Sequence, residues 1–354
     1  MLSKYMAQKI VDRMMDIIPY NVNVMDNKGI IIASGDKDRI DKLHLGAKKA
    51  LGGTTAIEVY KEKDGVKPGV NIPIRFNHRN IGVIGITGNP KIVRPFGELV
   101  RVTAELLIQQ EYSIEKYIIK NKLKEEYLYE WIHRKEIYDN EFINRGLEFN
   151  INIEEEGYIV IIDYKKEYVK ELKKIIEVYF NKEFEIVALS ASRSCIIINK
   201  NIEKINNFIE ELLNKGEDKV NIAVVLKKVG MLSKVFYGGI STINVAIALK
   251  IKKKVIRDSE AVFYSEIEKM VKNKDVKEIL VKIKNGGDDL LDTFNVFVEE
   301  NFEKGKTANI MHIHRNTLSY RLRKIEELTG LSFDNSIDIF RLTSVYIYYN
   351  IYAS

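Results

Sequence analysis

A group of basic, amide and hydroxyl side chains between residues 314 and 324 has the types and spacing needed to contact a DNA duplex. At about 100° per residue of helix, Leu318, Leu322 and Ile325 fall on one stripe, which must be buried. The opposite side can hydrogen-bond base edges, because arginine suits guanine, an amide suits adenine and a hydroxyl suits several bases. The residues expected at this surface are His314, Arg315, Asn316, Thr317, Ser319, Tyr320, Arg321, Arg323 and Lys324.

These side chains divide by the part of the duplex that they would meet. Those expected to face base edges are Asn316, Tyr320 and Arg323, with Ser319 at their flank. Those placed to meet phosphates are Arg315, Arg321 and Lys324. His314 either caps the start of the helix or donates to a phosphate. Residues 304–325 contain no acidic residue, although the whole chain has 56 Lys+Arg and 50 Asp+Glu. This local excess is the charge pattern of a DNA-binding element.

The elements that position this surface are two short helices. The pattern predicts helices over 306–311 and 314–328, joined by a turn at 312–313, with Gly330 ending the second. A preceding helix over 290–298 and a closing helix over 339–349 supply apolar faces. Two short helices with a small turn and a longer, basic second helix form a helix-turn-helix pattern.

The string from Ile313 to Leu322, together with Thr307-Ala308 and Thr329-Gly330, resembles the helix-turn-helix of purine-catabolism-regulator type proteins. Met311 departs from it, since leucine is more usual there, but both fill an apolar gap. The resemblance implies a double-stranded DNA operator as partner. Such a motif needs two copies for useful specificity, so we expect a homodimer or higher even oligomer. An interaction scaffold with a vestigial DNA motif is an alternative.

A second group of polar residues lies in the first hundred positions and suits an anion. A carboxylate needs fixed donors and net positive charge, which arginine, histidine and the N–H groups of glycine-rich turns supply. The candidates are Ser34, Gly35, Arg39, His44, Lys67, Gly69 and Asn71. Two simpler interpretations stay open: His44 is a surface or core histidine, and Pro68-Gly69 only shapes a turn.

Alternating apolar residues predict two hairpins around this group, 22–24 with 30–33 and 70–76 with 81–86. Helices are expected over 2–17, 38–51 and 96–111. Such a small α+β sensor is similar in outline to PAS or Cache modules. Its strings resemble the sugar-diacid recognition domain, notably Ile10-Val11-Asp12-Arg13, Asn21-Val22-Asn23-Val24, Leu43-His44-Leu45-Gly46, Val66-Lys67-Pro68-Gly69 and Ile81-Gly82-Val83-Ile84. The resemblance implies a sugar diacid or glycerate as ligand, and activation of genes for carbohydrate-acid catabolism.

The middle of the chain predicts a connector. Residues 111–132 form a charged helix whose heptads are not sustained, which favours a connector over a dimerisation coil. The order strand 158–163, helix 165–180, strands 185–189 and 195–198, helix 202–213 and strand 220–225 suggests a ferredoxin-like layer. It resembles the degenerate GGDEF-like domain found between sensor and DNA-binding parts.

A nucleotide-related enzyme is the alternative function for that domain. A cyclase needs a GG[DE]EF turn, but Gly238-Gly239-Ile240-Ser241 has no carboxylate. Gly286-Gly287-Asp288-Asp289 falls where a loop between helices is expected, and Leu290 replaces the aromatic. The one cysteine, Cys195, lies in a strand-like run and predicts a buried, inert thiol. We therefore expect no enzymatic activity, metal or cofactor.

Length and composition predict an α+β multidomain protein. A chain of 354 residues with 45% hydrophobic content exceeds one core. The expected domains are a sensor over 1–112, a coupling domain over 113–268 and an all-α helix-turn-helix domain over 269–354. The start lacks a signal-peptide pattern, and no apolar run approaches the roughly 20 residues of a membrane span. These features predict a cytoplasmic protein.

Overall fold

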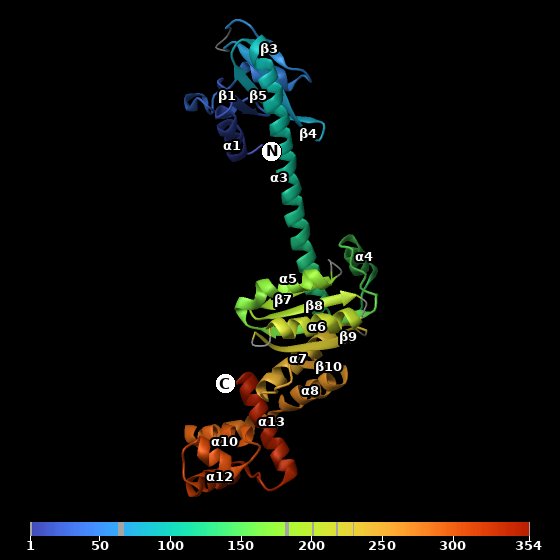
Figure 1. Ribbon diagram of the computed structural model, residues 1–354, viewed down its shortest axis with the longest axis vertical. Helices are drawn as coiled ribbons and strands as arrows, with labels where there is room; N and C mark the ends of the chain where they lie inside the picture. Colours follow the sequence, from blue (N-terminus) through green and yellow to red (C-terminus); the bar gives the residue numbers. More distant parts are fainter. Residues whose placement is uncertain are drawn as a thin grey trace. The chain divides into compact units, whose positions relative to one another are not determined.

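The computed structural model describes residues 2–62, 67–180, 184–199, 202–216, 219–228 and 230–353 of a mixed α+β chain (Figure 1). Val66, part of one of the quoted strings, lies outside these residues. The chain divides into two compact units, Met1–Lys122 and Leu123–Ser354. The division into three domains remains a prediction.

The first unit is built on an antiparallel sheet with the strand order β2-β1-β5-β4-β3. Its strands are β1 (Val22–Asp26), β2 (Ile31–Ser34), β3 (Ile57–Val59), β4 (Gly69–Phe76) and β5 (Arg79–Thr87). Both predicted hairpins are confirmed, since β1 pairs with β2 and β4 with β5. The second turns at Asn77 and His78, whose φ angles are +48° and +63°. Edge strand β3 was not predicted from the sequence.

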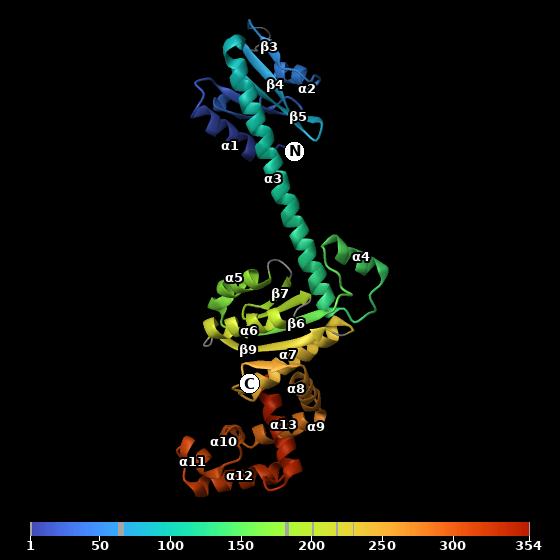
Figure 2. The same cartoon turned by 45° about the vertical axis from the view of Figure 1, so that its right-hand side comes forward.

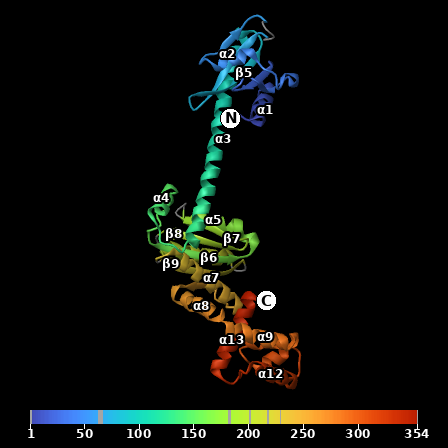
Figure 3. The same ribbon diagram turned by 180° about the vertical axis from the view of Figure 1, so that it is seen from behind.

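The two faces of this sheet are covered by different helices. One face packs on α1 (Lys4–Met15) and on the first part of α3 (Pro90–His133), with Ile10, Ile72 and Val100 fully buried between them. The other face carries the short helix α2 (Leu45–Leu51) over a smaller apolar cluster that includes Met25 and Val83. Figure 3 shows α2 and β5 from this side.

The predicted helix over 38–51 is wrong in its first half. A short 3₁₀ turn, η1 (Lys37–Arg39), is followed by extended backbone, and α2 begins only at Leu45. Asp41 has a φ of +65°, which ends any helix, and its N–H donates to the carbonyl of Ile31. Pairing with the edge of β2 satisfies the backbone groups that a continuous helix would have satisfied internally.

The helices predicted over 96–111 and 111–132 are one helix. α3 runs for 44 residues from Pro90 to His133 and contains Pro95. It belongs to both units, because the boundary between them follows Lys122.

The second unit contains a sheet with the order β10-β9-β6-β8-β7 (Figure 2). Its elements in chain order are α4 (Asn140–Glu148), β6 (Gly157–Tyr164), η2 (Lys166–Tyr168), α5 (Val169–Phe180), β7 (Phe184–Ser190), β8 (Arg193–Asn199), α6 (Ile202–Gly216), β9 (Val220–Lys228), α7 (Leu232–Ala248), β10 (Val255–Arg257) and α8 (Asp258–Val271). The predicted order from the strand at 158 to the strand at 220 is present. β10, parallel to β9, and the helices α4, α7 and α8 are additions.

Each face of this sheet has its own core. α5 and α6 cover one face, with Ile176 and Phe208 fully buried. α7 and the end of α3 cover the other, where Trp131 and Phe236 pack beside Cys195. Burial raises the pKa of the Cys195 thiol to about 12, as expected for an inert cysteine.

The chain ends in a bundle of helices that shares one core. Its helices are α9 (Lys274–Asn285), α10 (Asp288–Glu299), α11 (Lys304–Ile310), α12 (Arg315–Thr329) and α13 (Ser336–Tyr352). Gly286 and Gly287 form the turn between α9 and α10, so the second Gly-Gly pair is the helix-to-helix loop that was predicted. Gly330 ends α12 with a φ of +75°.

Candidate DNA interface and candidate ligand site

α11 and α12 form the predicted helix pair, and the start of α12 is fixed by its cap. His314 is the N-cap residue, and its ring accepts a hydrogen bond of 3.2 Å from the N–H of Asn316. The turn before it includes His312 at a φ of +52°. His314 therefore has the capping role, the first of the two that the sequence allowed.

The faces of α12 follow the predicted division. Leu318, Leu322 and Ile325 are buried in the bundle core, which also holds Phe294 and Phe297 of α10. Eight of the nine polar residues predicted to contact DNA are exposed: His314, Arg315, Asn316, Thr317, Ser319, Tyr320, Arg323 and Lys324. Arginine, amide and hydroxyl groups are thus presented to solvent on one short helix, as major-groove contacts require.

The ninth predicted residue, Arg321, contacts the neighbouring helix α10. Its guanidinium is 3.2 Å from the carboxylate of Asp289 and donates to the hydroxyl of Thr293, both on α10. Only 21% of its side chain is exposed. Arg321 therefore links α12 to α10 in this structure. The sequence had predicted that it contacts a DNA phosphate.

Five of the seven residues predicted to bind an anion line one small hollow in the first unit. They are Arg39, His44, Lys67, Gly69 and Asn71, and the strand residues Asn23, Val70, Gly85, Ile86 and Thr87 complete the lining. The hollow has a volume of about 10 Å³, which is room for about one water molecule. Among the residues that line it, Arg39 and Lys67 are cationic and none is acidic. Neither cation makes an ion pair with another described residue, so the hollow is positively charged.

A row of residues across the sheet forms the base of the hollow. Asn23 of β1 and Asn71 of β4 both pair with Gly85 of β5, and Ser34 of β2 pairs with Asn23. Asn71 is only 3% exposed, and its Oδ1 atom has no hydrogen-bond partner. A buried amide oxygen without a donor costs free energy, so this atom is ready to accept from a ligand hydroxyl.

His44 lines the same hollow as Asn71. Its Nδ1 accepts from the N–H of Ala47 and caps α2, which assigns the ring proton to Nε2 in the neutral form. Burial, and then the positive charge of Arg39, lower the pKa of His44 below its ordinary value. A Cβ atom on Gly46 would lie 2.9 Å from Asn71 Nδ2 and 3.1 Å from His44 Cε1. Glycine at position 46 therefore leaves room for both side chains.

The two remaining candidates do not line the hollow. Ser34 donates to Asn23 Oδ1 at 2.7 Å and so orients a lining residue. Gly35 packs against Met15, and its N–H donates to the carbonyl of Val22. Position 69 requires glycine, because a Cβ atom there would clash with the carbonyl oxygen of Ile86.

The lining residues Asn23, Val70, Gly85, Ile86 and Thr87 were not among the candidates predicted from the sequence. The available signal was an asparagine between two valines of a strand, since a polar side chain on a buried strand face needs a partner. Asn23 is 2% exposed.

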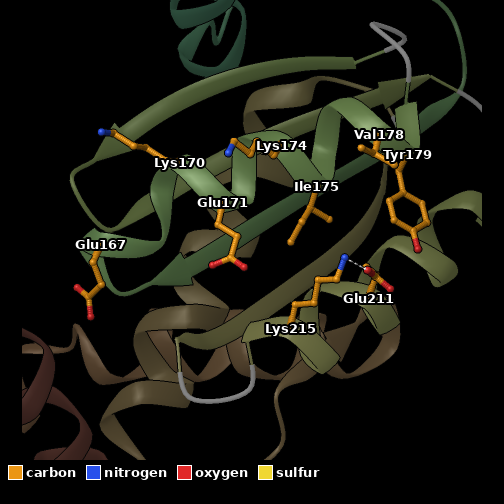
Figure 4. A pocket seen from close by; sticks show the side chains of 9 residues that line it. All are labelled: Glu167, Lys170, Glu171, Lys174, Ile175, Val178, Tyr179, Glu211 and Lys215. Atoms are coloured by element: carbon orange, nitrogen blue, oxygen red, sulfur yellow. Dashed lines mark ion pairs between the residues drawn. The ribbon is translucent and has the colours of Figure 1, made fainter.

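A groove on the second unit offers little distinctive chemistry. Figure 4 shows its walls, α5 and α6, which bring Lys170, Glu171, Lys174 and the paired Glu211 and Lys215 around Ile175. Charges of both signs alternate there, as on many solvated helix surfaces. Within the described ranges, no cluster of three or more His, Cys, Asp or Glu is arranged to hold a metal ion. Nor does any helix in those ranges have the length and apolar character of a membrane span.

Comparison with known proteins assigns both ends of the chain. Residues 2–131 match the family model described as "Putative sugar diacid recognition", and residues 290–346 match the "PucR C-terminal helix-turn-helix domain". A protein of Escherichia coli named carbohydrate diacid regulator is 29% identical over 95% of this chain and 95% of its own length.

Two uncharacterized proteins are similar over the same extent. One, from Haemophilus influenzae, is 29% identical over 95% of this chain and 96% of its own length. The other, YsfB of Bacillus subtilis, is 24% identical over 96% of this chain and 95% of its own length. The chain therefore carries a sugar diacid recognition domain at one end and a PucR-type helix-turn-helix at the other, the domain pair of a DNA-binding transcription regulator, and it is similar over nearly its whole length to the carbohydrate diacid regulator.

Proposed function

We propose that this chain is a cytoplasmic activator of carbohydrate-acid catabolism that binds glycerate or a sugar diacid in the hollow of its first unit. The observation that carries the ligand assignment is the pairing of two free cations, Arg39 and Lys67, with the unpartnered oxygen of Asn71. A carboxylate matches the cations, and a hydroxyl group matches the amide oxygen. A hydroxy acid carries both groups.

The size of the hollow bears on how a ligand would enter. Its volume of about 10 Å³ holds about one water molecule. A sugar acid would therefore bind only after lining side chains such as the exposed Lys67 move apart.

The DNA contacts are proposed for the exposed face of α12. Asn316, Tyr320 and Arg323 would meet base edges, while Arg315 and Lys324 would meet phosphates on an operator duplex. A basic helix is often only a solvated surface. Here the match to the PucR-type helix-turn-helix model and the exposed polar residues of α12 both support a DNA-binding role. Two copies would bind paired half-sites.

The part between sensor and DNA-binding helices is proposed to couple them and to have no catalytic role. This coupling part would comprise residues 113–268 and have a degenerate GGDEF-like fold. It would lie in the chain between a PAS/Cache-like sensor and the helix-turn-helix domain. Support comes from α13, which packs against α7 and α8 as well as α9 and α10. A displacement of α7 or α8 would therefore be transmitted through α13 to the helix bundle that contains α12. Ligand binding drives such a shift only by its differential affinity for the two arrangements.

Thermal unfolding of the full chain with glycerate, glucarate and galactarate tests the ligand. An acid at about 100 times its dissociation constant should stabilise the unit that binds it by roughly 2.7 kcal/mol. Adipate is the matched control for the six-carbon acids, because it has both carboxylates and no hydroxyl group for Asn71. If adipate stabilises the chain as much as galactarate does, Asn71 does not have the proposed role. If no hydroxy acid raises the unfolding temperature, the ligand assignment is wrong.

Variants locate the binding. Arg39→Ala should abolish the ligand-induced shift in unfolding temperature, whereas Arg79→Ala should retain it. Arg79 is an exposed arginine of the same unit that does not line the hollow. An equal shift in both variants would place the ligand elsewhere.

A further inference from the structure

Two buried asparagines lie on either side of a glycine at the base of the hollow. Asn23 of β1 and Asn71 of β4 are each paired with Gly85 of β5. Residues paired directly across neighbouring strands have their side chains on the same face of a sheet, and Gly85 has no side chain to separate the two amides. Asn23 is 2% exposed and Asn71 is 3% exposed. Buried amides need hydrogen-bond partners, so the groups that they leave unpaired point to a missing ligand group.

The amide of Asn23 offers a donor to the hollow. Its oxygen is already used, because the Ser34 hydroxyl donates to Asn23 Oδ1 at 2.7 Å and Asn21 Nδ2 donates to the same atom at 3.1 Å. The Ser34 oxygen accepts from the N–H of Asp36, which leaves its hydroxyl proton for Asn23. The other end of this amide, Nδ2, has no acceptor among the described residues. Asn23 lines the hollow, so Nδ2 is the group that it can offer there.

The amide of Asn71 offers an acceptor. Its Oδ1 atom is buried and has no hydrogen-bond partner. A Cβ atom at position 85 would lie 3.2 Å from Asn71 Oδ1, so glycine at this position keeps the space beside that oxygen open. One donor and one acceptor, both without partners among the described residues, therefore line the same hollow.

The hollow has the size and the polarity of one hydroxyl group. Its volume of about 10 Å³ holds about one water molecule. A hydroxyl group accepts one hydrogen bond and donates another, so it satisfies both amides. A ketone oxygen only accepts, and a methylene group does neither, so each would leave Asn71 Oδ1 unpaired at a cost in free energy. Arg39 and Lys67 line the same hollow, so a carboxylate bound by them would lie beside this hydroxyl group.

We propose that Asn23 and Asn71 are the specificity-determining residues of the ligand site, and that they select an acid with a hydroxyl group on the carbon next to its carboxylate. Asn71 rejects the corresponding 2-oxo acid, and Asn23 together with Asn71 rejects the acid without an oxygen at that carbon. The inference rests on the proposed ligand site and adds what that site distinguishes. The sensor responds to the hydroxy acid and not to the product of its oxidation at that carbon.

Calorimetric titration of the full wild-type chain tests the selection. Glycerate, hydroxypyruvate and 3-hydroxypropionate differ only at the carbon next to the carboxylate, which carries a hydroxyl group, a ketone oxygen or two hydrogen atoms. Racemic glycerate should bind at least about tenfold more tightly than either, because a site that hydrogen-bonds a hydroxyl group rejects analogues that lack it.

The possible failures of this titration separate the two proposals. Equal affinities for glycerate and hydroxypyruvate would refute the selection and leave the ligand site standing. Binding of galactarate without binding of glycerate would have the same meaning, because glycerate carries both groups that the two asparagines and the cations require. Binding of none of these acids would refute the ligand site and the selection together.

Two variants separate the roles of the two asparagines. Asn71→Ala should bring the ratio of the dissociation constants for hydroxypyruvate and glycerate close to one, because the acceptor is lost. Asn23→Ala should keep that ratio, since its donor serves a hydroxyl group and a ketone alike. Asn23→Ala should instead lower the ratio for 3-hydroxypropionate and glycerate. A general loss of stability weakens the binding of all three acids equally and leaves both ratios unchanged.

Asn27→Ala is the matched control, because Asn27 is an exposed asparagine at the turn between β1 and β2. It should keep both wild-type ratios. Unchanged ratios in Asn71→Ala and in Asn23→Ala would mean that the two amides only support the sheet or hold a buried water molecule, and would overturn the proposal. The wild-type titration decides the selection even where a variant does not fold.

Discussion

The phenol of Tyr352 on α13 donates a hydrogen bond of 2.5 Å to Glu268 Oε1 on α8. Ser241 and Asn244 of α7 donate to the same carboxylate, and the ammonium of Lys272 lies 3.6 Å from it. Burial opposes ionisation of Glu268, but these hydrogen bonds and the charge of Lys272 outweigh it and lower the pKa of its carboxyl. A buried, ionised carboxylate thus ties the last helix of the chain to the middle of the second unit.

The same network reaches the sheet. Asn244 accepts a hydrogen bond of 3.2 Å from Arg193 of β8, and Arg193 pairs with Asp163 of β6 at 3.0 Å. The sheet is therefore linked through polar side chains to α13, which packs in the core of the bundle that holds α12. This is a physical route for the coupling proposed above.

Tyr352→Phe should lower the free energy of unfolding of the full chain by about 1.5–3 kcal/mol, the usual contribution of a hydrogen bond to a charged group. Denaturant unfolding measures it. Tyr348→Phe is the control, since the ring of Tyr348 packs against that of Tyr352 at an angle of 42° and the Tyr348 hydroxyl makes no hydrogen bond to Glu268. Equal losses in the two variants would show that the hydrogen bond is unimportant.

Stability should fall as the pH drops from about 7 to about 5.5, partly because of His44. Its pKa is lowered in the folded state, so the unfolded chain binds more protons below the ordinary value of 6.5. The free energy of unfolding then decreases with falling pH until the folded pKa is passed. Burial also lowers the pKa of His133, so the contribution of His44 is the difference between wild type and His44→Gln. Parallel pH profiles of the two proteins would contradict this assignment.

Gly46→Ala should weaken ligand binding by about tenfold or more, because the new methyl group displaces Asn71 or His44. Calorimetric titration with the acid identified by thermal unfolding measures it. Gly52→Ala is the control, since a Cβ atom there meets only the carbonyl oxygen of Lys49 at 3.6 Å. Undiminished affinity in Gly46→Ala would mean that the ligand does not depend on these two side chains.

Asn316→Ala and Arg323→Ala should each weaken binding to a duplex selected from a random library by about 1–3 kcal/mol, without loss of stability. Both residues are exposed, and neither belongs to the hydrophobic core of the bundle. Arg321→Ala should instead lower stability, because it breaks the contacts to Asp289 and Thr293. Lys282→Ala, an exposed lysine on α9, is the control for general charge loss. Unchanged DNA affinity in both Asn316→Ala and Arg323→Ala would place the DNA contacts elsewhere.

The helix-turn-helix was predictable because its signals are local. The stripe of Leu318, Leu322 and Ile325, the capping His314 and the terminating Gly330 all act within one helix, so spacing alone specifies its faces. The ion pair of Arg321 with Asp289 could not be predicted, because Asp289 lies 32 residues earlier and helical spacing carries no information on such a partner. The order of strands and helices from β6 to β9 was predictable for the same local reasons.

Elements and sites that depend on neighbours far along the chain could be predicted less well from the sequence. The segment from Ile40 to His44 has the apolar spacing of a helix, yet it pairs with the edge of β2. Five residues of the hollow were predicted from the sequence. Asn23 and Gly85 were not, because only the strand register brings them next to the others.

The most direct test of a ligand-controlled regulator is the affinity of the full chain for its selected duplex, measured by fluorescence anisotropy with and without saturating acid at fixed salt. Coupling between two sites amounts to about 1–3 kcal/mol, so the dissociation constant should change by roughly 5- to 150-fold. The change should vanish in Arg39→Ala. An identical dissociation constant with and without an acid that demonstrably binds would contradict the account, since the hollow would then have no influence on α12.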